Sequence, residues 1–419
     1  MGFSAKQQDY FQNADKRWNI KSGATRSGKS YMDLYVIPKR IRARIGKQGL
    51  VAILGVSKGT IERNILEPMR EIWGNALVGN IRSDNKCFLF GEWVYCLGAE
   101  KVNQVSKLRG ASIKYCYGDE VADWSQDVFD MLKSRLDKPY SCFDGTLNPQ
   151  NPNHWLKTFL ESDADIYLQE YTIFDNPFLD SKFVEELCKE YEGTVFYDRY
   201  ILGKWKRAEG AIYRKFADNP KPFYCKVVDK ISEDIGVKQF LKSQIMETCV
   251  GVDFGGNKSG HAFVATAKIR GYTDLVILGS ERHFGDLAPD DLNNLILAFL
   301  EKIIGQYGLI DFLYWDNAET VLGRGLKKAV GDKYPSITVR PARKEIVNGR
   351  IRCTTMLMGS GRFWYTDDCK TVKAALSEAV WDEKEKTKDI RLDDGSTDID
   401  SLDALEYTFE RDMRHFINV

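Results

Sequence analysis

The stretch SGATRSGKSY, residues 22–31, decides how the first half of this chain folds. From Gly23 it reads G-x-x-x-x-G-K-S, which is the P-loop pattern. Its glycines let successive backbone N–H groups curl around a phosphate, its lysine meets the β- and γ-phosphate oxygens, and its serine ligates Mg²⁺. The run therefore predicts an ATP site. The candidate ATP-binding residues in it are Gly23, Arg26, Gly28, Lys29 and Ser30.

The flanking sequence has the pattern that a P-loop needs. RWNIKSG, residues 17–23, is strand-like, and the apolar residues of 29–46 recur mostly at helical spacing. A strand followed by a helix places the helix N-terminus, with its partial positive charge, at the anion site. Pro38 lies inside the expected helix, and we expect it to kink or interrupt that helix.

Length and composition bound the remaining possibilities. A chain of 419 residues is too long for one ordinary core, so two domains are expected. Its 60 basic and 60 acidic residues balance, which gives no global sign of a nucleic-acid or membrane partner. The sequence has no apolar run of transmembrane length, its start is too polar for a secretory signal, and its nine cysteines include no CxxC pair. We expect a soluble intracellular protein with buried thiols.

An acidic pair follows the next informative strand. In SIKYCYGDEVADW, residues 112–124, the apolar residues alternate up to Asp119 and Glu120. After a P-loop, such a pair is expected to hold Mg²⁺ through Asp119 and to activate the attacking water through Glu120. A polar turn after a strand is the alternative. Strand-like runs at 50–58 and 87–99, with a helical run between them, favour a largely parallel sheet.

Other polar residues are candidates for supporting roles in ATP hydrolysis. Thr146 and Asn148, in SCFDGTLNP, follow another strand and could sense hydrolysis, or could form an ordinary turn. Arg26 and Arg109 are candidates for the positive charge that stabilises the transition state, or are surface arginines.

The second half predicts a different chemistry. We place a linker at 208–245 between an ATPase domain, 1–207, and a second domain, 246–419. There, Asp253 and Asp316 end apolar strands, while Asp400 and Asp403 lie on an expected helix. Carboxylates at two strand ends and on one helix suit a ribonuclease H-like nuclease with two divalent metal ions, Mg²⁺ or Mn²⁺. The alternative is that these acids only keep loops soluble.

Taken together, both halves resemble the large terminase subunit of tailed bacteriophages, close to the compact kind of Gram-positive phages and prophages. Seven motifs carry the resemblance across almost the whole chain: GATRSGKS (23–30), LRGASIKYCYGDE (108–120), GTLNP (145–149), EGAIYRKF (209–216), VGVDFGG (250–256), YWDNAE (314–319) and DSLDALEY (400–407). The resemblance implies a RecA-like (ASCE) P-loop ATPase domain followed by a ribonuclease H-like nuclease domain, both α/β.

The resemblance also assigns residue roles. It implies that Lys29, Ser30, Asp119 and Glu120 bind ATP and Mg²⁺ and prime water, and that Thr146 and Asn148 couple hydrolysis to movement. Arg109 matches the arginine that reaches a neighbouring subunit's nucleotide, and Gln7 or Gln8, of which we select Gln8, matches the adenine-side glutamine. The nuclease acids are Asp253, Asp316 and Asp403. Relatives often carry a histidine where this chain has Asp400, so either Asp400 or Asp403 is the main third ligand.

The implied function is a motor that pumps double-stranded viral DNA into a procapsid and cuts concatemeric DNA. The implied partners are DNA, the small terminase subunit, the portal protein and further copies of this chain in a ring, in the host cytoplasm and transiently at the portal. The basic runs 38–47 and 340–352 are candidates for DNA contact or solvated helix faces.

Three alternatives stay open. A helicase or repair ATPase with a nuclease domain would need further helicase motifs, which the sequence lacks. A P-loop scaffold with an inactive nuclease fold would not need all three acids. A small-molecule kinase would leave the last 170 or so residues unexplained.

Overall fold

The computed structural model describes residues 2–108, 110–232, 236–255, 259–285, 287–395 and 397–417. They form two compact units, one of Met1–Val184 with Val195–Arg207 and the other of Glu185–Thr194 with Ala208–Val419. Within the described ranges, no helix combines the length and apolarity needed to span a membrane. Eight of the nine cysteines are buried free thiols, as the sequence predicts, and Cys188 is half-buried.

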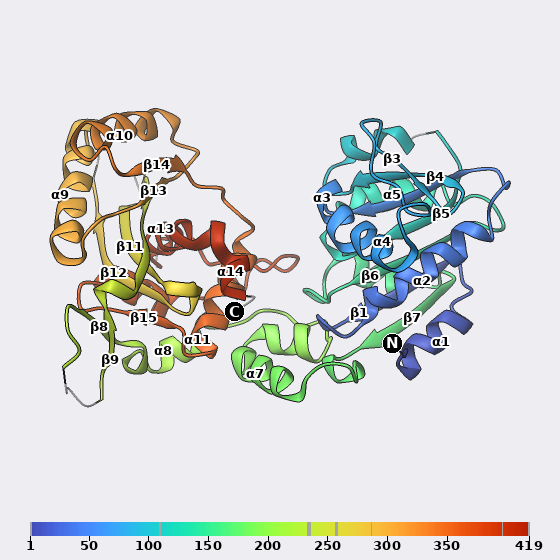
Figure 1. Ribbon diagram of the computed structural model, residues 1–419, viewed down its shortest axis with the longest axis horizontal. Coiled ribbons are helices and arrows are strands. Elements are labelled where there is room, and N and C mark those ends of the chain that lie inside the picture. The colour runs from blue at the N-terminus through green and yellow to red at the C-terminus, as the bar shows by residue number, and fades with distance from the viewer. Residues whose placement is uncertain are drawn as a thin grey trace. The chain divides into compact units, whose positions relative to one another are not determined.

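The first unit is built on a seven-stranded sheet in the order β3-β4-β2-β5-β6-β1-β7 (Figure 1, blue to green). All neighbours are parallel except β3 and β4, which form an antiparallel hairpin. Strand β6 lies between β1, which leads into the P-loop, and β5, which leads into the acidic pair. This order confirms the predicted RecA-like P-loop fold. The strands are β1 (Trp18–Gly23), β2 (Leu50–Gly55), β3 (Lys86–Leu89), β4 (Glu92–Gly98), β5 (Ile113–Gly118), β6 (Cys142–Leu147) and β7 (Ile166–Tyr171).

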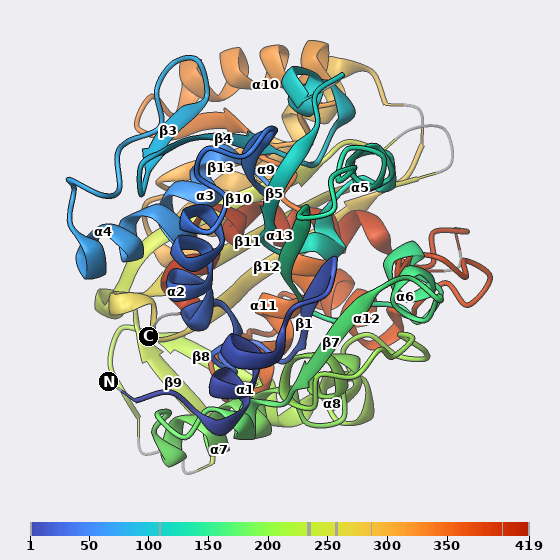
Figure 2. The ribbon, with the colours of Figure 1, turned by 90° about the vertical axis from the view of Figure 1, so that its right-hand side faces the viewer.

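Helices cover both faces of this sheet because its strands are apolar on both sides. Val51 and Ile53 of β2 pack in the cluster that includes helices α2 and α4, whereas Ala52 and Leu54 pack in the cluster that includes α5. Helix α1 contacts α2 (Figures 1 and 2). The α-helices of this unit are α1 (Ala5–Asn13), α2 (Lys29–Arg42), α3 (Lys58–Ile61), α4 (Glu67–Trp73), α5 (Gln126–Lys133) and α6 (Trp155–Leu160). Its π-helices are η1 (Glu62–Leu66) and η5 (Tyr197–Ile201), and its 3-10 helices are η2 (Val102–Leu108), η3 (Val121–Asp123) and η4 (Ile173–Asp175). Helix α7 (Ser181–Tyr191) begins in the first unit and ends in the second.

Pro38 does not interrupt α2, so of the two outcomes that we expected, a kink or an interruption, the interruption is wrong. The helix runs from Lys29 to Arg42 with Pro38 inside it. Because proline has no N–H, the carbonyl of Leu34 loses its usual donor four residues on. The indole Nε1 of Trp73 donates to that carbonyl at 2.9 Å instead. A side chain from α4 therefore supplies the hydrogen bond that the proline removes.

The second unit has a six-stranded sheet in the order β14-β13-β10-β11-β12-β15 (Figure 1, yellow to red). Strands β10, β11 and β12 form an antiparallel meander, and β13 and β14 continue the sheet parallel to β10. This arrangement confirms the predicted ribonuclease H-like fold. The strands are β10 (Ile245–Asp253), β11 (His261–Ile269), β12 (Leu275–His283), β13 (Phe312–Trp315), β14 (Thr338–Pro341) and β15 (Phe363–Tyr365).

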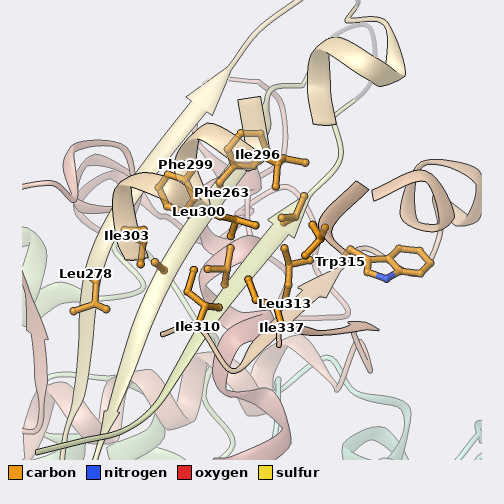
Figure 3. Packing of buried hydrophobic residues seen from close by; sticks show 14 of the residues in the cluster. Phe263, Leu278, Ile296, Phe299, Leu300, Ile303, Ile310, Leu313, Trp315 and Ile337 are labelled. Atoms are coloured by element: carbon orange, nitrogen blue, oxygen red, sulfur yellow. The ribbon is translucent and has the colours of Figure 1, made fainter. Parts of the chain in front are cut away.

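Alternation along β10 sends its side chains to two different layers. Val250 and Val252 join the main core, which helices α9 and α10 complete; Figure 3 shows Ile296, Phe299, Leu300 and Ile303 of α9 within it. Gly251 faces α13 on the other side. The helices are α9 (Pro289–Tyr307), α10 (Thr320–Lys333), α11 (Val347–Gly359), α12 (Lys370–Glu378), α13 (Ile399–Phe409) and α14 (Met413–Ile417), with turns η8 (Arg270–Tyr272) and η9 (Glu410–Asp412).

The segment 208–245, where we expected a linker, lies within the second unit. It contains helix α8 (Arg214–Asp218), the turns η6 (Lys221–Phe223) and η7 (Lys242–Gln244), and the parallel pair β8 (Cys225–Val228) and β9 (Lys238–Leu241). Phe216 and Phe223 are buried, and the ring of Phe216 lies 5.7 Å from that of Tyr365 in β15. The mixed charge of this segment suggested a linker, but its few buried aromatic side chains attach it to the sheet.

Gly251 should be irreplaceable, because α13 approaches β10 there without room for a side chain. A Cβ at this position would lie 1.8 Å from the carbonyl oxygen of Ala404. We predict that Gly251→Ala lowers the free energy of unfolding, measured by urea titration, by about 2–3 kcal/mol. The control is Gly331→Ala in α10, where no atom lies within 4 Å and alanine should stabilise the helix by up to about 1 kcal/mol. A Gly251→Ala protein as stable as the parent would contradict the close approach.

Candidate active sites

The P-loop forms the turn between β1 and α2. A Cβ on Gly23 would lie 2.1 Å from the carbonyl oxygen of Tyr171, so only glycine permits this approach of two backbones. Arg26 and Gly28 adopt left-handed φ angles of 57° and 87°. These turns curl the backbone into the concave shape that binds anions through its N–H groups.

Lys29 occupies the centre of this loop. Its ammonium group donates to the carbonyl oxygens of Gly23 and Ala24 at 2.9 and 2.6 Å and to Oδ1 of Asn148 at 3.0 Å. Burial lowers the pKa of Lys29 to about 7. A bound phosphate would offset that cost because its negative charge favours the protonated amine. Ser30 lies beside it, exposed, in the first turn of α2.

The acidic pair stands directly after β5. Asp119 is 3% exposed, and its carboxylate accepts from Asn64 Nδ2 at 3.1 Å and from Thr146 Oγ1 at 3.3 Å. Burial, and then the charge of Glu120, raise the pKa of Asp119 to about 6. Glu120 has a left-handed φ of 53°, an uncommon backbone conformation for a residue with a side chain. A buried carboxylate beside a second acid fits a divalent cation such as Mg²⁺.

Strand β6 joins the two halves of the predicted ATP site. Because it lies between β1 and β5, the residues at its end meet both loops: Thr146 donates to Asp119, and Asn148 accepts from Lys29. The structure therefore brings the two proposed coupling residues together with the lysine and the buried acid. Asn64 also contacts that acid, and sequence analysis missed it because it lies in a helical segment with no motif.

A pocket of about 290 Å³ opens beside the P-loop. Asn176 lines it and donates through Nδ2 to the carbonyl oxygen of Arg26 at 2.7 Å. The lining residues are Arg26, Ser27, Gly28, Lys29, Ser30, Tyr31, Asn176 and Leu179. The loop thus borders a space in which a ligand can lie.

Gln7, and not the predicted Gln8, contacts the P-loop. Gln7 is 3% exposed and donates through Nε2 to the carbonyl oxygen of Gly28 at 2.8 Å. Gln8 is exposed and donates to the carbonyl oxygen of Phe3. Adjacent residues on a helix point in directions about 100° apart, so the choice depends on how α1 packs. Arg109 lies outside the described residues.

The acids of the second unit gather around Asp253, at the end of β10. Asp253 is 8% exposed, and its Oδ1 accepts from the hydroxyl of Tyr407 at 3.0 Å. Burial, and then the charges of Asp403 on α13 and Asp316 after β13, raise the pKa of Asp253 well above its ordinary value. The three predicted acids therefore share one electrostatic environment.

Basic side chains form ion pairs with two of these acids, Asp316 and Asp403. Lys344 Nζ lies 2.5 Å from Asp316 Oδ1, and Asp403 Oδ1 lies 2.5 Å from Arg391 Nη2 and 3.4 Å from Arg350 Nη1. Among the described residues, no three acids, histidines or cysteines are close enough to hold a metal ion. The chemistry of this donor set still suits divalent cations, because carboxylates that lie near one another around a buried Asp253 require positive charge. Two of the bases missed by sequence analysis belong to the basic run 340–352.

Asp400 and Asp403 have different surroundings. Oδ2 of Asp400 accepts from the backbone N–H of Gly260 at 2.8 Å and from Arg282 Nη2 at 2.6 Å. Its influence on the pKa of Asp253 is smaller than that of Asp403. This favours Asp403 as the third acid and a supporting position for Asp400.

The raised pKa of Asp119 gives a testable pH dependence. The folded protein binds this proton more tightly than the unfolded chain, so the contribution of Asp119 to stability is present below pH 4 and is lost as the pH rises to about 6. In the absence of nucleotide, Asp119→Asn should be more stable than the parent at pH 7 by about 1–3 kcal/mol, and this difference should shrink towards pH 4. Urea titrations at both pH values test this.

The matched control is Asp130→Asn, at an exposed position on α5. Its difference from the parent should be small and similar at the two pH values. A stability difference for Asp119→Asn that does not change with pH would contradict the burial of a charged Asp119.

Comparison with known proteins agrees with both folds. Residues 21–217 match the family model described as terminase large subunit, T4likevirus-type, N-terminal. No curated protein matches the sequence. The large terminase of a thermophilic bacteriophage has a similar structure, with a TM-score of 0.79 and 22% identity over 98% of this chain and 99% of that chain.

Two complexes of the same thermophilic phage protein are also similar, each at 22% identity over 97% of this chain and 98% of that chain. The complex with ADP gives a TM-score of 0.77 and the complex with ATP-gamma-S gives 0.76. The resemblance noted in the sequence is thus confirmed. Residues 21–217 match the model of the terminase large subunit family, and the whole chain has the fold of a phage large terminase.

Proposed function

We propose that this chain is the large subunit of a viral DNA-packaging terminase. ATP hydrolysis in the first unit drives double-stranded DNA into a procapsid, and a nuclease in the second unit cuts concatemeric DNA. One observation carries the proposal: the same chain contains two candidate sites, and its fold matches a large terminase over nearly its whole length. One site is a P-loop connected to an acidic pair, and the other is a set of three acids in a ribonuclease H-like fold.

The first unit binds and hydrolyses ATP. The P-loop backbone and Lys29 bind the phosphates, and the pocket beside the loop takes the rest of the nucleotide. Ser30 and Asp119 are the residues that would hold Mg²⁺, which supplies positive charge to the phosphate oxygens when bound. Glu120 accepts a proton from the attacking water. The thermophilic phage terminase, whose structures include ADP and ATP-gamma-S complexes, supports a nucleotide as ligand.

Coupling and transition-state stabilisation need further residues. Thr146 and Asn148 contact Asp119 and Lys29, so a change of partners at either loop reaches the end of β6. Arg109 is our candidate for the arginine that completes a neighbouring subunit's site, with Arg26 in the loop itself as the alternative. An arginine supplied in this way raises the rate by about three to five orders of magnitude in other nucleotide hydrolases.

The second unit cleaves DNA with the three acids around Asp253. Asp253, Asp316 and Asp403 would hold two divalent ions, Mg²⁺ or Mn²⁺, which together supply an activated water and stabilise the leaving oxygen. Asp400 fixes the neighbouring backbone at Gly260 and pairs with Arg282. Tyr407 orients the carboxylate of Asp253 through its hydroxyl.

The proposed partners follow from packaging itself. They are double-stranded DNA, the small terminase subunit, the portal protein and further copies of this chain in a ring, in the host cytoplasm. A neutral overall charge suits a motor that must bind DNA and release it again.

Separate variants test the two activities. We expect Lys29→Ala to lower ATP hydrolysis at least about 100-fold while cleavage of supercoiled plasmid with Mn²⁺ survives, because a charge that stabilises the transition state is removed from one site only. Asp253→Asn should abolish cleavage and leave ATP hydrolysis unchanged. Gel assays of plasmid and a phosphate-release assay measure the two rates.

Asp291→Asn is the matched control, since Asp291 is an exposed acid in the first turn of α9. It should change neither rate. If no metal supports cleavage while ATP is still hydrolysed, the chain is instead an ATP-dependent scaffold with an inactive nuclease fold.

A further inference from the structure

The loop after β14 is held by a buried carboxylate. Glu410, 3% exposed, accepts hydrogen bonds from the backbone N–H groups of three successive residues. Arg343 and Lys344 donate to Oε1, the latter at 3.3 Å, and Glu345 donates to Oε2 at 3.0 Å. Charge-assisted bonds of this kind are stronger than neutral ones. The loop therefore has one preferred course over the end of α13.

This course directs Lys344 towards Asp316. Lys344 has a left-handed φ of 53°, and its Nζ lies 2.5 Å from Asp316 Oδ1. The same oxygen accepts from the backbone N–H of Ala318 at 2.9 Å. The ammonium group thus forms an ion pair with a carboxylate whose charge also raises the pKa of Asp253. A metal cation bound by these acids would need the same carboxylate.

Lys344 differs from the other bases near the acids. Arg350 and Arg391, with side chains 4% and 6% exposed, each also pair with the buried Glu406 at 3.0 Å. Moving either arginine would leave a buried charge without its partner, which is costly. The side chain of Lys344 is 37% exposed, and its ammonium can return to water on a flexible stem. Lys344 is therefore able to leave its carboxylate at low cost.

We propose that Lys344 is a tethered counter-ion of Asp316 that competes with divalent metal ions for this carboxylate. The inference rests on the proposed nuclease function of the second unit. The lysine neutralises Asp316 while no metal is bound and gives way when an ion binds. The loop anchored on Glu410 keeps it within reach. Lys344 thereby sets the metal concentration that the nuclease site requires.

Binding of Mn²⁺ to the full chain, without DNA or nucleotide, tests this directly. The free Mn²⁺ signal in electron paramagnetic resonance gives the dissociation constant, and Asp253→Asn identifies which binding belongs to the nuclease site. An exposed ion pair contributes up to about 1 kcal/mol, a factor of about five. Lys344→Met should therefore bind Mn²⁺ at this site about fivefold more tightly than the parent. Lys344→Arg should stay close to the parent.

The control is Lys333→Met. Lys333 forms an exposed ion pair with Glu301 at 2.8 Å in the same unit, away from the acids, and its loss should leave the dissociation constant unchanged. Unchanged or weaker binding in Lys344→Met, with an Asp253-dependent site present in the parent, overturns the inference alone. A parent without any Asp253-dependent site overturns the proposed nuclease and this inference with it.

Discussion

The first unit depends on one buried ion pair beneath the P-loop. Lys21 of β1 and Asp33 of α2 lie 2.6 Å apart, and neither side chain is exposed. Tyr117 of β5 donates to Asp33 at 3.0 Å, and the ring centroid of Tyr10 lies 3.6 Å from the Lys21 ammonium. Breaking such a pair typically costs about 3–5 kcal/mol because a buried charge is left alone. The strand before the loop, the helix after it and the strand of the acidic pair are thereby fixed to one another.

The second unit also contains a buried network of ion pairs, formed by different residues. Glu406 of α13 is fully buried and pairs with Arg350 and Arg391, while Tyr213 donates to it at 3.3 Å. The two arginines continue to Asp403, one turn earlier on the same helix. Each candidate active site therefore stands on a buried ionic network that consists of side chains from separate parts of the chain.

The sequence predicts what depends on local pattern. The positions of Asp119, Asp253 and Asp316 at strand ends were predictable, because an apolar run that stops at an acid indicates both the strand and the residue where it ends. What depends on contacts between distant segments was not predictable. The helix through Pro38 needs Trp73 from another helix, and the choice of Gln7 over Gln8 needs the packing of α1. The bases beside Asp316 and Asp403 were not predictable for the same reason, since a basic run does not reveal which acid it will contact.

The position of β6 between β1 and β5 matters for how a change at the P-loop could be transmitted through the sheet. Its backbone hydrogen bonds register it against β1 on one side and β5 on the other. The strand that contains Thr146 and leads into Asn148 is thus bonded to both of its neighbours. A disturbance at the P-loop would therefore enter a strand that has bonded neighbours on both sides in the middle of the sheet.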